Sequence, residues 1–146
     1  MKVALEEAKK AYKQGEVPVG AVIVKNGKVI SKAHNETRQE KNAVAHAEIL
    51  AIDKACKKLE NERLVDTEMY VTLEPCAMCA GAIVQARIPE VMIGTRDLKS
   101  GAANTILNVL ENEKLNHRAE LRFGILEEEC SEILKTFFKE LRDERK

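Results

Sequence analysis

Two runs of β-branched residues that meet at Asn26-Gly27 constrain the fold of this chain more than any other feature. Their sequence, GAVIVKNGKVISKA, covers residues 20–33. An Asn-Gly pair between two apolar runs is the strongest short-range indication of a β-hairpin, so we expect two antiparallel strands here. Helical and strand patterns alternate farther along the chain, which is typical of parallel strands connected by helices. Together these patterns predict a three-layer α/β domain with a mixed sheet.

The other expected elements follow from hydrophobic periodicity and from residues that start or end an element. Apolar residues at helical spacing, among them Leu5, Ala8 and Ala11, predict a first helix that ends at Gly15. Further helices are expected at residues 43–59, from Pro75 to about residue 87, at 105–112 and at 127–142. Beyond the hairpin, strands are expected at residues 67–73, 89–95 and 120–125, which gives a five-stranded sheet.

The composition is that of a globular protein, with 45% apolar and 33% charged residues, and the length fits a single domain over residues 1–146. The 24 basic and 24 acidic side chains cancel, so an RNA partner would need a local basic patch. No apolar run of about 18 residues predicts a membrane span. The first sixteen residues mix acids and bases, unlike a signal peptide. We therefore expect a cytoplasmic protein with no membrane association.

The chain has four cysteines, two of which stand three residues apart in the segment VTLEPCAMC, residues 71–79. In a cytoplasmic protein a Cys-x-x-Cys pair indicates metal or redox chemistry more often than a disulfide scaffold. A disulfide is therefore the weakest interpretation of this segment. The other two, Cys56 and Cys130, fit buried helical thiols without a chemical role.

Cys76 and Cys79 are placed to bind a zinc ion. They lie at the start of an expected helix, where residues three apart share one face and the positive end of the helix stabilises thiolates. A catalytic zinc site has three protein ligands, and His46, also near the start of an expected helix, is the best third candidate. Two thiolates and one neutral imidazole would balance the charge of the dication.

Glu48, two residues after His46, indicates that this site is hydrolytic. A structural zinc site needs no additional carboxylate, whereas hydrolysis needs a group that takes a proton from water and delivers it to the leaving group. His-x-Glu followed by Pro-Cys-x-x-Cys is the signature of zinc-dependent nucleobase deaminases. A closed structural zinc site, completed by Cys56 or Cys130, is the alternative that these residues alone leave open.

Segments along almost the whole chain resemble bacterial tRNA-specific adenosine deaminases, which convert the wobble adenosine of a tRNA anticodon to inosine. These segments are GEVPVGAVIV (15–24), HN (34–35), AHAEILAI (45–52), YVTLEPCAMCAGAI (70–83), GTRDLKSGAA (94–103), LNHR (115–118), GILEEEC (124–130) and FFKELR (137–142). The resemblance implies a CMP/dCMP-type zinc deaminase domain with the cytidine-deaminase-like α/β/α sandwich fold. It also implies one zinc ion per subunit and a homodimer whose composite surface binds tRNA.

The resemblance further assigns roles to individual residues. His46, Cys76 and Cys79 match the zinc ligands, and Glu48 matches the proton shuttle for attack of water at C6 of adenine. Asn35 matches an asparagine that hydrogen-bonds the target base, although a turn-forming asparagine after the hairpin is the alternative. The remaining matches are expected near the RNA: Arg96, Asp97, Lys99 and Ser100 in a loop, Asn116 and His117 by the flipped nucleotide, and Phe137, Phe138 and Arg142 on the last helix. One of the two phenylalanines is expected in the core.

The sequence departs from this family at two points. Ala43-Val44 replaces a Pro-Thr pair that often precedes the ligand histidine, without effect on the chemistry. Asn104 stands where glycine is common, which weakens the expectation that the loop at residues 96–104 contacts RNA.

Two other functions fit the same signature. Guanine and cytosine deaminases, which act on free bases, also contain His-x-Glu and Pro-Cys-x-x-Cys. The segments RDLKSGAA, NHR and FFKELR favour the tRNA enzyme, because they have no evident use with a free base. An inactive subunit that only supports RNA binding is the non-enzymatic alternative. The presence of Glu48 weighs against it, since such a subunit needs no proton shuttle.

Overall fold

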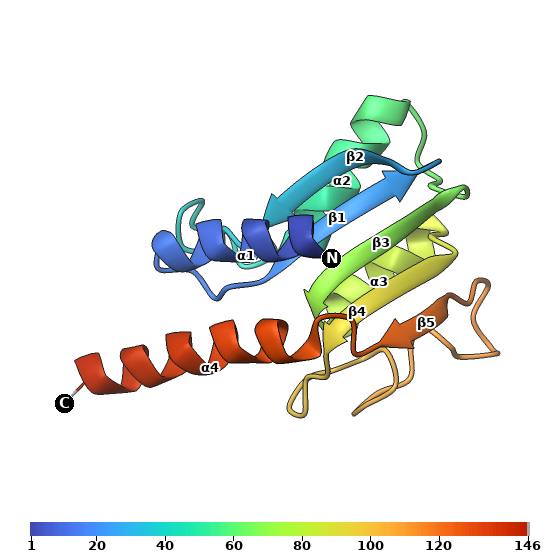
Figure 1. Ribbon diagram of the computed structural model, residues 1–146. Coiled ribbons are helices and arrows are strands. Elements are labelled where there is room, and N and C mark those ends of the chain that lie inside the picture. The colour runs from blue at the N-terminus through green and yellow to red at the C-terminus, as the bar shows by residue number, and fades with distance from the viewer. Residues whose placement is uncertain (146) are drawn as a thin grey trace.

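The computed structural model describes residues 1–145 and contains one mixed sheet between two layers of helices (Figure 1). The five strands within these residues are β1 (Gly20–Lys25), β2 (Lys28–His34), β3 (Thr67–Leu73), β4 (Glu90–Thr95) and β5 (Glu120–Phe123). Their order across the sheet is β2-β1-β3-β4-β5. β1 pairs antiparallel with β2 and β3, while β3, β4 and β5 run parallel. The expected mixed, five-stranded sheet is confirmed.

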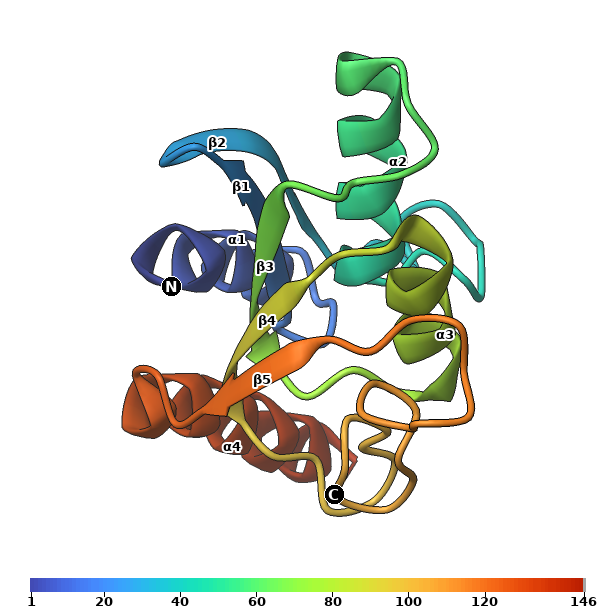
Figure 2. The same ribbon diagram turned by 90° about the vertical axis from the view of Figure 1, so that its right-hand side faces the viewer.

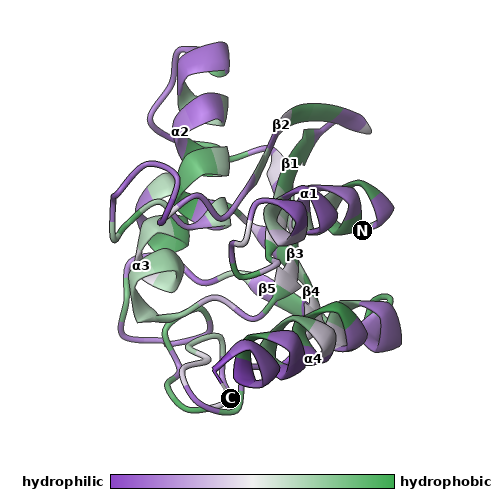
Figure 3. Cartoon of the chain, turned by 90° about the vertical axis from the view of Figure 1, so that its left-hand side faces the viewer, coloured by the Kyte–Doolittle hydropathy of each residue, from purple (hydrophilic) through white to green (hydrophobic). Residues whose placement is uncertain are grey.

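The helices cover both faces of this sheet and confirm the three-layer α/β/α arrangement. In the described part of the chain they are α1 (Lys2–Lys13), α2 (Ala47–Leu59), α3 (Ala77–Ala86) and α4 (Glu127–Glu144). α2 and α3 lie on one face, and α1 and α4 lie on the other (Figure 2). Hydrophilic residues cover the outer sides of α1 and α4, while the strands between the layers contain hydrophobic stretches (Figure 3). Within residues 1–145, no helix is long and apolar enough to span a membrane.

Asn26 and Gly27 form the turn between β1 and β2, as the sequence predicts. Both have positive φ, 51° and 75°, the conformation that a two-residue hairpin turn requires and that asparagine and glycine tolerate. At the start of β1, Gly20 allows α1 to approach the sheet closely. A Cβ atom there would lie only 1.9 Å from the carbonyl oxygen of Ala4.

Two helices begin later than expected, each at a candidate ligand. α2 starts at Ala47 rather than at residue 43, and its N-cap is His46, in extended conformation with φ −78° and ψ 152°. α3 starts at Ala77 rather than at Pro75, and its N-cap is Cys76, also extended, with φ −75° and ψ 177°. Each of these two residues therefore stands directly at the N-terminus of a helix.

The prediction of a helix at residues 105–112 is wrong, because these residues form turns and irregular backbone instead. Their backbone N–H groups bond to carbonyl groups outside helical spacing. Ile106 and Leu107 both donate to the carbonyl oxygen of Gly101, at 2.9 and 3.1 Å. The same turns leave Ile106 and Leu107 exposed and place Leu110 in the core, fully buried.

The burial of Leu110 is tested by two leucine substitutions between β4 and β5, at Leu110 and Leu115. Leu110→Ala is expected to lower the free energy of unfolding by about 2–5 kcal/mol, because it leaves a cavity in the core. Leu115→Ala, at a side chain that is 42% exposed, is expected to change it by at most about 0.5 kcal/mol. Equilibrium denaturation measures both values, and equal losses would contradict the placement of Leu110.

Candidate active site

His46, Cys76 and Cys79 converge at the N-termini of α2 and α3. Their ligand atoms all lie within 4.8 Å of one another. The Nδ1 atom of His46 is 3.7 Å from Cys76 Sγ and 3.5 Å from Cys79 Sγ. Zinc–nitrogen and zinc–sulfur bonds of tetrahedral sites place nitrogen and sulfur ligands roughly 3.5–3.6 Å apart. The donor set and its spacing therefore fit a metal ion held by one imidazole and two thiolates.

Strand β3 delivers the two cysteines to this point. It ends at Leu73, at the carboxyl edge of the parallel part of the sheet, where ligands commonly bind in open α/β sheets. Glu74 and Pro75 alone separate the strand from Cys76. Cys79 lies in the first turn of α3 and is fully buried, so its thiol stands on the same side of the helix as that of Cys76.

The three candidate ligands perturb one another electrostatically. Hydrogen bonds from Cys79 and from His46 hold the pKa of Cys76 well below its usual range. The hydrogen bond to Cys76, together with burial, raises the pKa of Cys79, and the hydrogen bond to Cys76 also raises the pKa of His46. Cys76 is therefore a thiolate near neutral pH even before a metal binds, which favours metal binding because ligand cysteines must be deprotonated.

Glu48 lies in the first turn of α2, and its side chain is only 4% exposed. Burial raises the pKa of Glu48 to about 7, although a hydrogen bond from its own backbone N–H and the charge on His46 oppose this rise. A hydrogen bond to Cys79 connects the carboxyl to the three candidate ligands. A carboxyl group with a pKa near neutrality can both accept and release a proton during a reaction.

Asn35 connects the end of β2 to the start of α2. Its Oδ1 atom accepts a hydrogen bond from the backbone N–H of Ala47 at 2.9 Å. This bond satisfies one of the free N–H groups of the helix, whose N-cap, His46, makes no side-chain cap hydrogen bond. In the part of the chain described, we find no hydrogen bond from the Asn35 amide NH2, so that group can donate to a ligand. The capping contact is compatible with either interpretation of Asn35.

Six of the residues expected near RNA line one cleft of about 750 Å³ between the 95–100 segment and α4. They are Arg96, Asp97, Lys99, Ser100, Phe138 and Arg142. Lys135 and Arg145 also line it, so five basic side chains and one acidic side chain among the described residues face the cleft. The whole chain has no net charge, which makes this cleft the kind of local basic patch that RNA binding requires.

The two neighbouring phenylalanines of α4 differ in burial, as the sequence analysis expects. Phe137 is 9% exposed and packs edge-to-face against Tyr12 of α1, with ring centroids 6.1 Å apart. Phe138 is 40% exposed and lines the basic cleft.

The structure does not bring Asn116 and His117 to this cleft. His117 Nε2 donates to the carbonyl oxygen of Ile88 at 2.7 Å, just before the start of β4. The cleft lies at the other end of that strand, beside Thr95. A role for these two residues near a flipped nucleotide stays a prediction.

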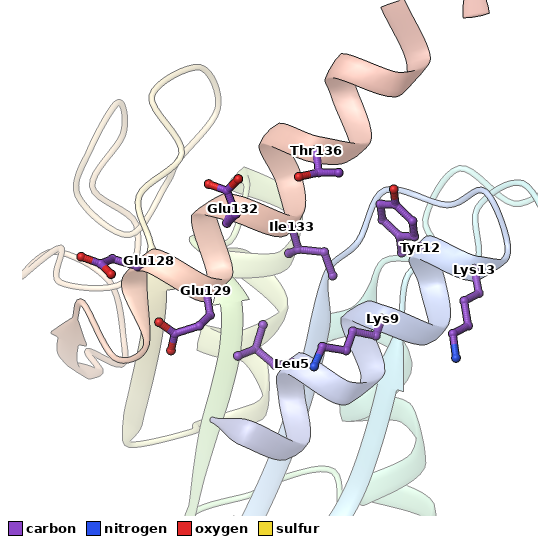
Figure 4. Close-up of a pocket in the computed structure, with 9 residues that line it drawn as sticks. All are labelled: Leu5, Lys9, Tyr12, Lys13, Glu128, Glu129, Glu132, Ile133 and Thr136. Atoms are coloured by element: carbon purple, nitrogen blue, oxygen red, sulfur yellow. The ribbon is translucent and has the colours of Figure 1, made fainter. Parts of the chain in front are cut away.

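A second cleft, of about 720 Å³, lies between α1 and α4 (Figure 4). It is lined by Leu5, Lys9, Tyr12, Lys13, Glu128, Glu129, Glu132, Ile133 and Thr136. None of the candidate site residues lines it, so we assign it no part in the chemistry.

The structure contains two buried carboxylates that the sequence motifs do not indicate: Glu74, two residues before Cys76, and Glu16, which contacts residues 37–39. Glu16 is fully buried and Glu74 is 2% exposed. Glutamate is most often a surface residue, so the sequence alone does not indicate burial. The one available signal is that Glu74 directly precedes the Pro-Cys-x-x-Cys motif.

The MafB19-like deaminase family model matches residues 1–142. The protein is therefore a deaminase by class. A tRNA-specific adenosine deaminase of Bacillus subtilis (strain 168) is 52% identical over 146 residues, which are 100% of this chain and 91% of that protein. A solved structure from work on A-to-I editing by tRNA:A34 deaminases superposes with a TM-score of 0.89 and 43% identity, over 92% of this chain and 97% of that one. The chain therefore belongs to the tRNA-specific adenosine deaminase family, which confirms the resemblance.

A guanine deaminase structure from Bacillus subtilis is a more distant match. It is 31% identical and has a TM-score of 0.64, over 97% of this chain and 90% of that one.

The three-residue ligand set predicts which cysteine substitution abolishes metal binding. Cys79→Ala is expected to lose the bound metal and part of the stability, because a catalytic zinc site has only three protein ligands and metal binding contributes to folding. Cys56→Ala, which removes a thiol of α2 outside the triad, is expected to keep one metal ion per chain. Elemental analysis of the purified proteins measures the number of metal ions bound per chain. Full metal occupancy in the Cys79 variant would show that another ligand set is in use.

The raised pKa of Glu48 makes the stability of the metal-free protein depend on pH. Its pKa in the folded state is about 7, against 4.5 for an unperturbed glutamate, so the folded state binds the proton more tightly. Stability is therefore lost as the pH rises from about 4.5 through about 7. Glu48→Gln has no ionisable group at this position and removes this loss. Its free energy of unfolding is expected to exceed that of the wild type by on the order of 3 kcal/mol at pH 8, and to be about equal to it at pH 4.

Urea denaturation of both proteins in the presence of a chelator measures this difference at each pH. A difference that does not change between pH 4 and pH 8 would contradict the burial of an ionisable Glu48.

Proposed function

We propose that this chain is a zinc-dependent hydrolase that converts the wobble adenosine of tRNA anticodons to inosine and releases ammonia. The proposal treats residues 1–146 as one zinc deaminase domain. The observation that carries it is the buried Glu48 beside His46, Cys76 and Cys79. A 52% identity to a tRNA-specific adenosine deaminase supports the choice of substrate.

His46, Cys76 and Cys79 hold the metal in this proposal. A bound zinc ion polarises a water molecule and lowers its pKa to about 7, which makes a nucleophile available at neutral pH. The positive ends of α2 and α3 stabilise the two thiolates, and the extended conformation of His46 and Cys76 turns their side chains toward one another.

Glu48 moves the protons. It takes one proton from the attacking water and gives it to N1 of the adenine ring while the water oxygen adds to C6. A second proton passes through the carboxyl to the exocyclic nitrogen, so that ammonia leaves and the oxygen stays on C6.

Asn35 orients the target base. The N–H of Ala47 holds its Oδ1 atom, so its NH2 group serves as a donor to a ring nitrogen of the purine. The wobble nucleotide already lies in a loop, so moving it into the site costs at most a few kcal/mol.

The basic cleft binds the anticodon loop in this proposal. Lys99 and Arg142 meet the phosphates, and the exposed ring of Phe138 offers a stacking surface for a base. The proposal also includes contacts from Arg96, Asp97, Ser100, Asn116 and His117.

The working unit in this proposal is a cytoplasmic homodimer. Exposed apolar side chains flank the ligand-bearing segments: Val44 precedes His46 by two residues, and Met78 stands between the two ligand cysteines. Ile106 and Leu107 are also exposed. Packing of a second copy against these side chains would remove them from water, which favours association.

The test is inosine formation in an anticodon stem-loop with adenosine at the wobble position. The wild type is expected to convert it, while Glu48→Ala is expected to keep its metal and fold but to lose about 10²–10⁴-fold in rate, the typical contribution of a positioned acid–base group. Near-normal turnover by Glu48→Ala would contradict the proton-shuttle role. No conversion by the wild type, together with ammonia release from free guanine or cytosine, would assign the chain to the free-base deaminases instead.

A further inference from the structure

Glu74 is a buried carboxylate that accepts several hydrogen bonds from one loop. Its Oε1 atom accepts hydrogen bonds from the backbone N–H of Asp97 at 3.2 Å and from the hydroxyl of Thr105 at 2.5 Å. Its Oε2 atom accepts from the backbone N–H groups of Ala103, Asn104 and Thr105 at 3.0, 3.2 and 3.2 Å. All five donors belong to the segment 97–105, named here the substrate loop. A buried charge is stable only when it is hydrogen-bonded in this way.

The same residue is fixed to the metal site through the backbone. Only Pro75 stands between it and Cys76, the N-cap of α3. The N–H of Glu74 donates to the carbonyl oxygen of Thr95 at 2.9 Å, and the N–H of Ala102 donates to the carbonyl oxygen of Pro75 at 2.8 Å. The substrate loop and the ligand-bearing turn are therefore joined both through backbone and through the Glu74 side chain.

Gly101 shows how closely the loop approaches this carboxylate. A Cβ atom at residue 101 would lie 2.5 Å from Cδ of Glu74 and 2.6 Å from the carbonyl oxygen of Asp97. Only a glycine allows such an approach, so the loop is wrapped tightly around the charge.

A second set of hydrogen bonds connects Glu74 through Thr105 to Arg96, which lines the basic cleft. The hydroxyl of Thr105, which donates to Glu74, accepts a hydrogen bond from Arg96 Nη1 at 2.9 Å. Arg96 also donates to Asn104 Oδ1 at 2.6 Å, and its guanidinium lies 3.8 Å above the ring of Phe123. Arg96 is thus held by the protein itself, and its position follows from that of Thr105.

The outer end of the loop is shaped by Asp97, whose own N–H is bonded to Glu74. Asp97 Oδ1 accepts from the N–H groups of Lys99 and Ser100 at 3.0 and 3.1 Å, and Oδ2 accepts from the Ser100 hydroxyl at 2.8 Å. Lys99 and Ser100 line the basic cleft. Their places in the cleft therefore depend on where Glu74 holds Asp97.

We propose that Glu74 is a positioning residue that fixes the substrate loop relative to the metal-ligating Cys76. It thereby sets the distance between the place of the chemistry and the side chains that hold the RNA. This inference rests on the proposed function for its substrate. It goes beyond that function because it links RNA affinity to a residue that belongs neither to the candidate ligand group nor to the lining of the basic cleft.

The test is Glu74→Gln, which keeps the shape of the side chain and replaces one acceptor oxygen with a donor group. In the metal-loaded protein the variant is expected to raise KM for the wobble-adenosine stem-loop about tenfold or more, with kcat changed less than threefold and one metal ion retained per chain. An unchanged KM would overturn the proposal, and so would a loss of metal in proportion to the loss of activity.

Glu16→Gln is the matched control, because Glu16 is also a fully buried carboxylate that accepts backbone N–H groups from a loop. It accepts from Arg38 and Gln39, at 3.1 and 2.7 Å, and it is not adjacent in sequence to any candidate ligand. It is expected to lower the thermal unfolding midpoint about as much as Glu74→Gln does, with less than a twofold change in KM. An equal rise of KM in both variants would reduce Glu74 to a purely structural role and overturn the proposal.

Hydroxyl substitutions at Thr105 keep the proposal testable if Glu74→Gln does not fold. Thr105→Val removes the hydroxyl bonds to Glu74 and from Arg96, keeps the backbone N–H bond to Glu74, and is expected to raise KM about threefold. Thr105→Ser retains the hydroxyl and is expected to have the wild-type KM. Equal KM values for the two would contradict the link from Glu74 to Arg96.

Hydrogen exchange separates this inference from the proposed function, because it needs no substrate. The N–H groups of Ala103, Asn104 and Thr105 are expected to exchange at least tenfold faster in Glu74→Gln than in the wild type, both metal-loaded. If they remain protected, the positioning role is wrong whatever the substrate. If they exchange faster but the wild type does not convert the stem-loop, the proposed function alone fails.

Discussion

The site depends on two helix N-termini that point at the same place. α2 and α3 begin at His46 and Cys76, and each brings unpaired N–H groups and partial positive charge to this point. Two such ends repel one another unless electron-rich groups lie between them. The thiolate of Cys76, a candidate metal ligand, and the capping oxygen of Asn35 supply them and so allow the two helices to meet.

The parts of the fold that could be predicted from the sequence are those set by local pattern. The Asn26-Gly27 turn requires positive φ at both residues, and the alternation in residues 67–73 defines a strand without reference to the rest of the chain. The three candidate ligands that the structure brings together could be named from the sequence, because metal chemistry restricts both residue type and spacing. The absence of a helix at residues 105–112 could not be predicted, because Glu74, which accepts the N–H of Thr105, lies far away in the sequence and acts through the tertiary structure. The start of α2 is likewise not evident from the local sequence, since its capping oxygen comes from Asn35, twelve residues before Ala47.

Charge in this protein acts locally rather than in bulk. The 24 basic and 24 acidic side chains give no net charge, yet five basic side chains gather on one cleft. Glu16 and Glu74 are buried, and each accepts hydrogen bonds from the backbone N–H groups of a loop. Because these carboxylates are buried and satisfied by hydrogen bonds, salt screens them far less than it screens the cleft.

The last helix lies on the face of the sheet opposite α2 and α3, and its C-terminal half extends beyond the strands (Figure 1). Tyr12 connects α1 to this extension through a hydrogen bond to Glu140 and through its contact with Phe137. In the proposed function, α4 forms one wall of the basic cleft and the loop after β4 forms the other. Under the proposed function, substitutions along α4 change one wall of the cleft and leave the candidate metal ligands and Glu48, which α2 and α3 carry on the opposite face, unaltered. Such an arrangement would let the choice of nucleic acid vary through one helix without a change at the candidate metal site.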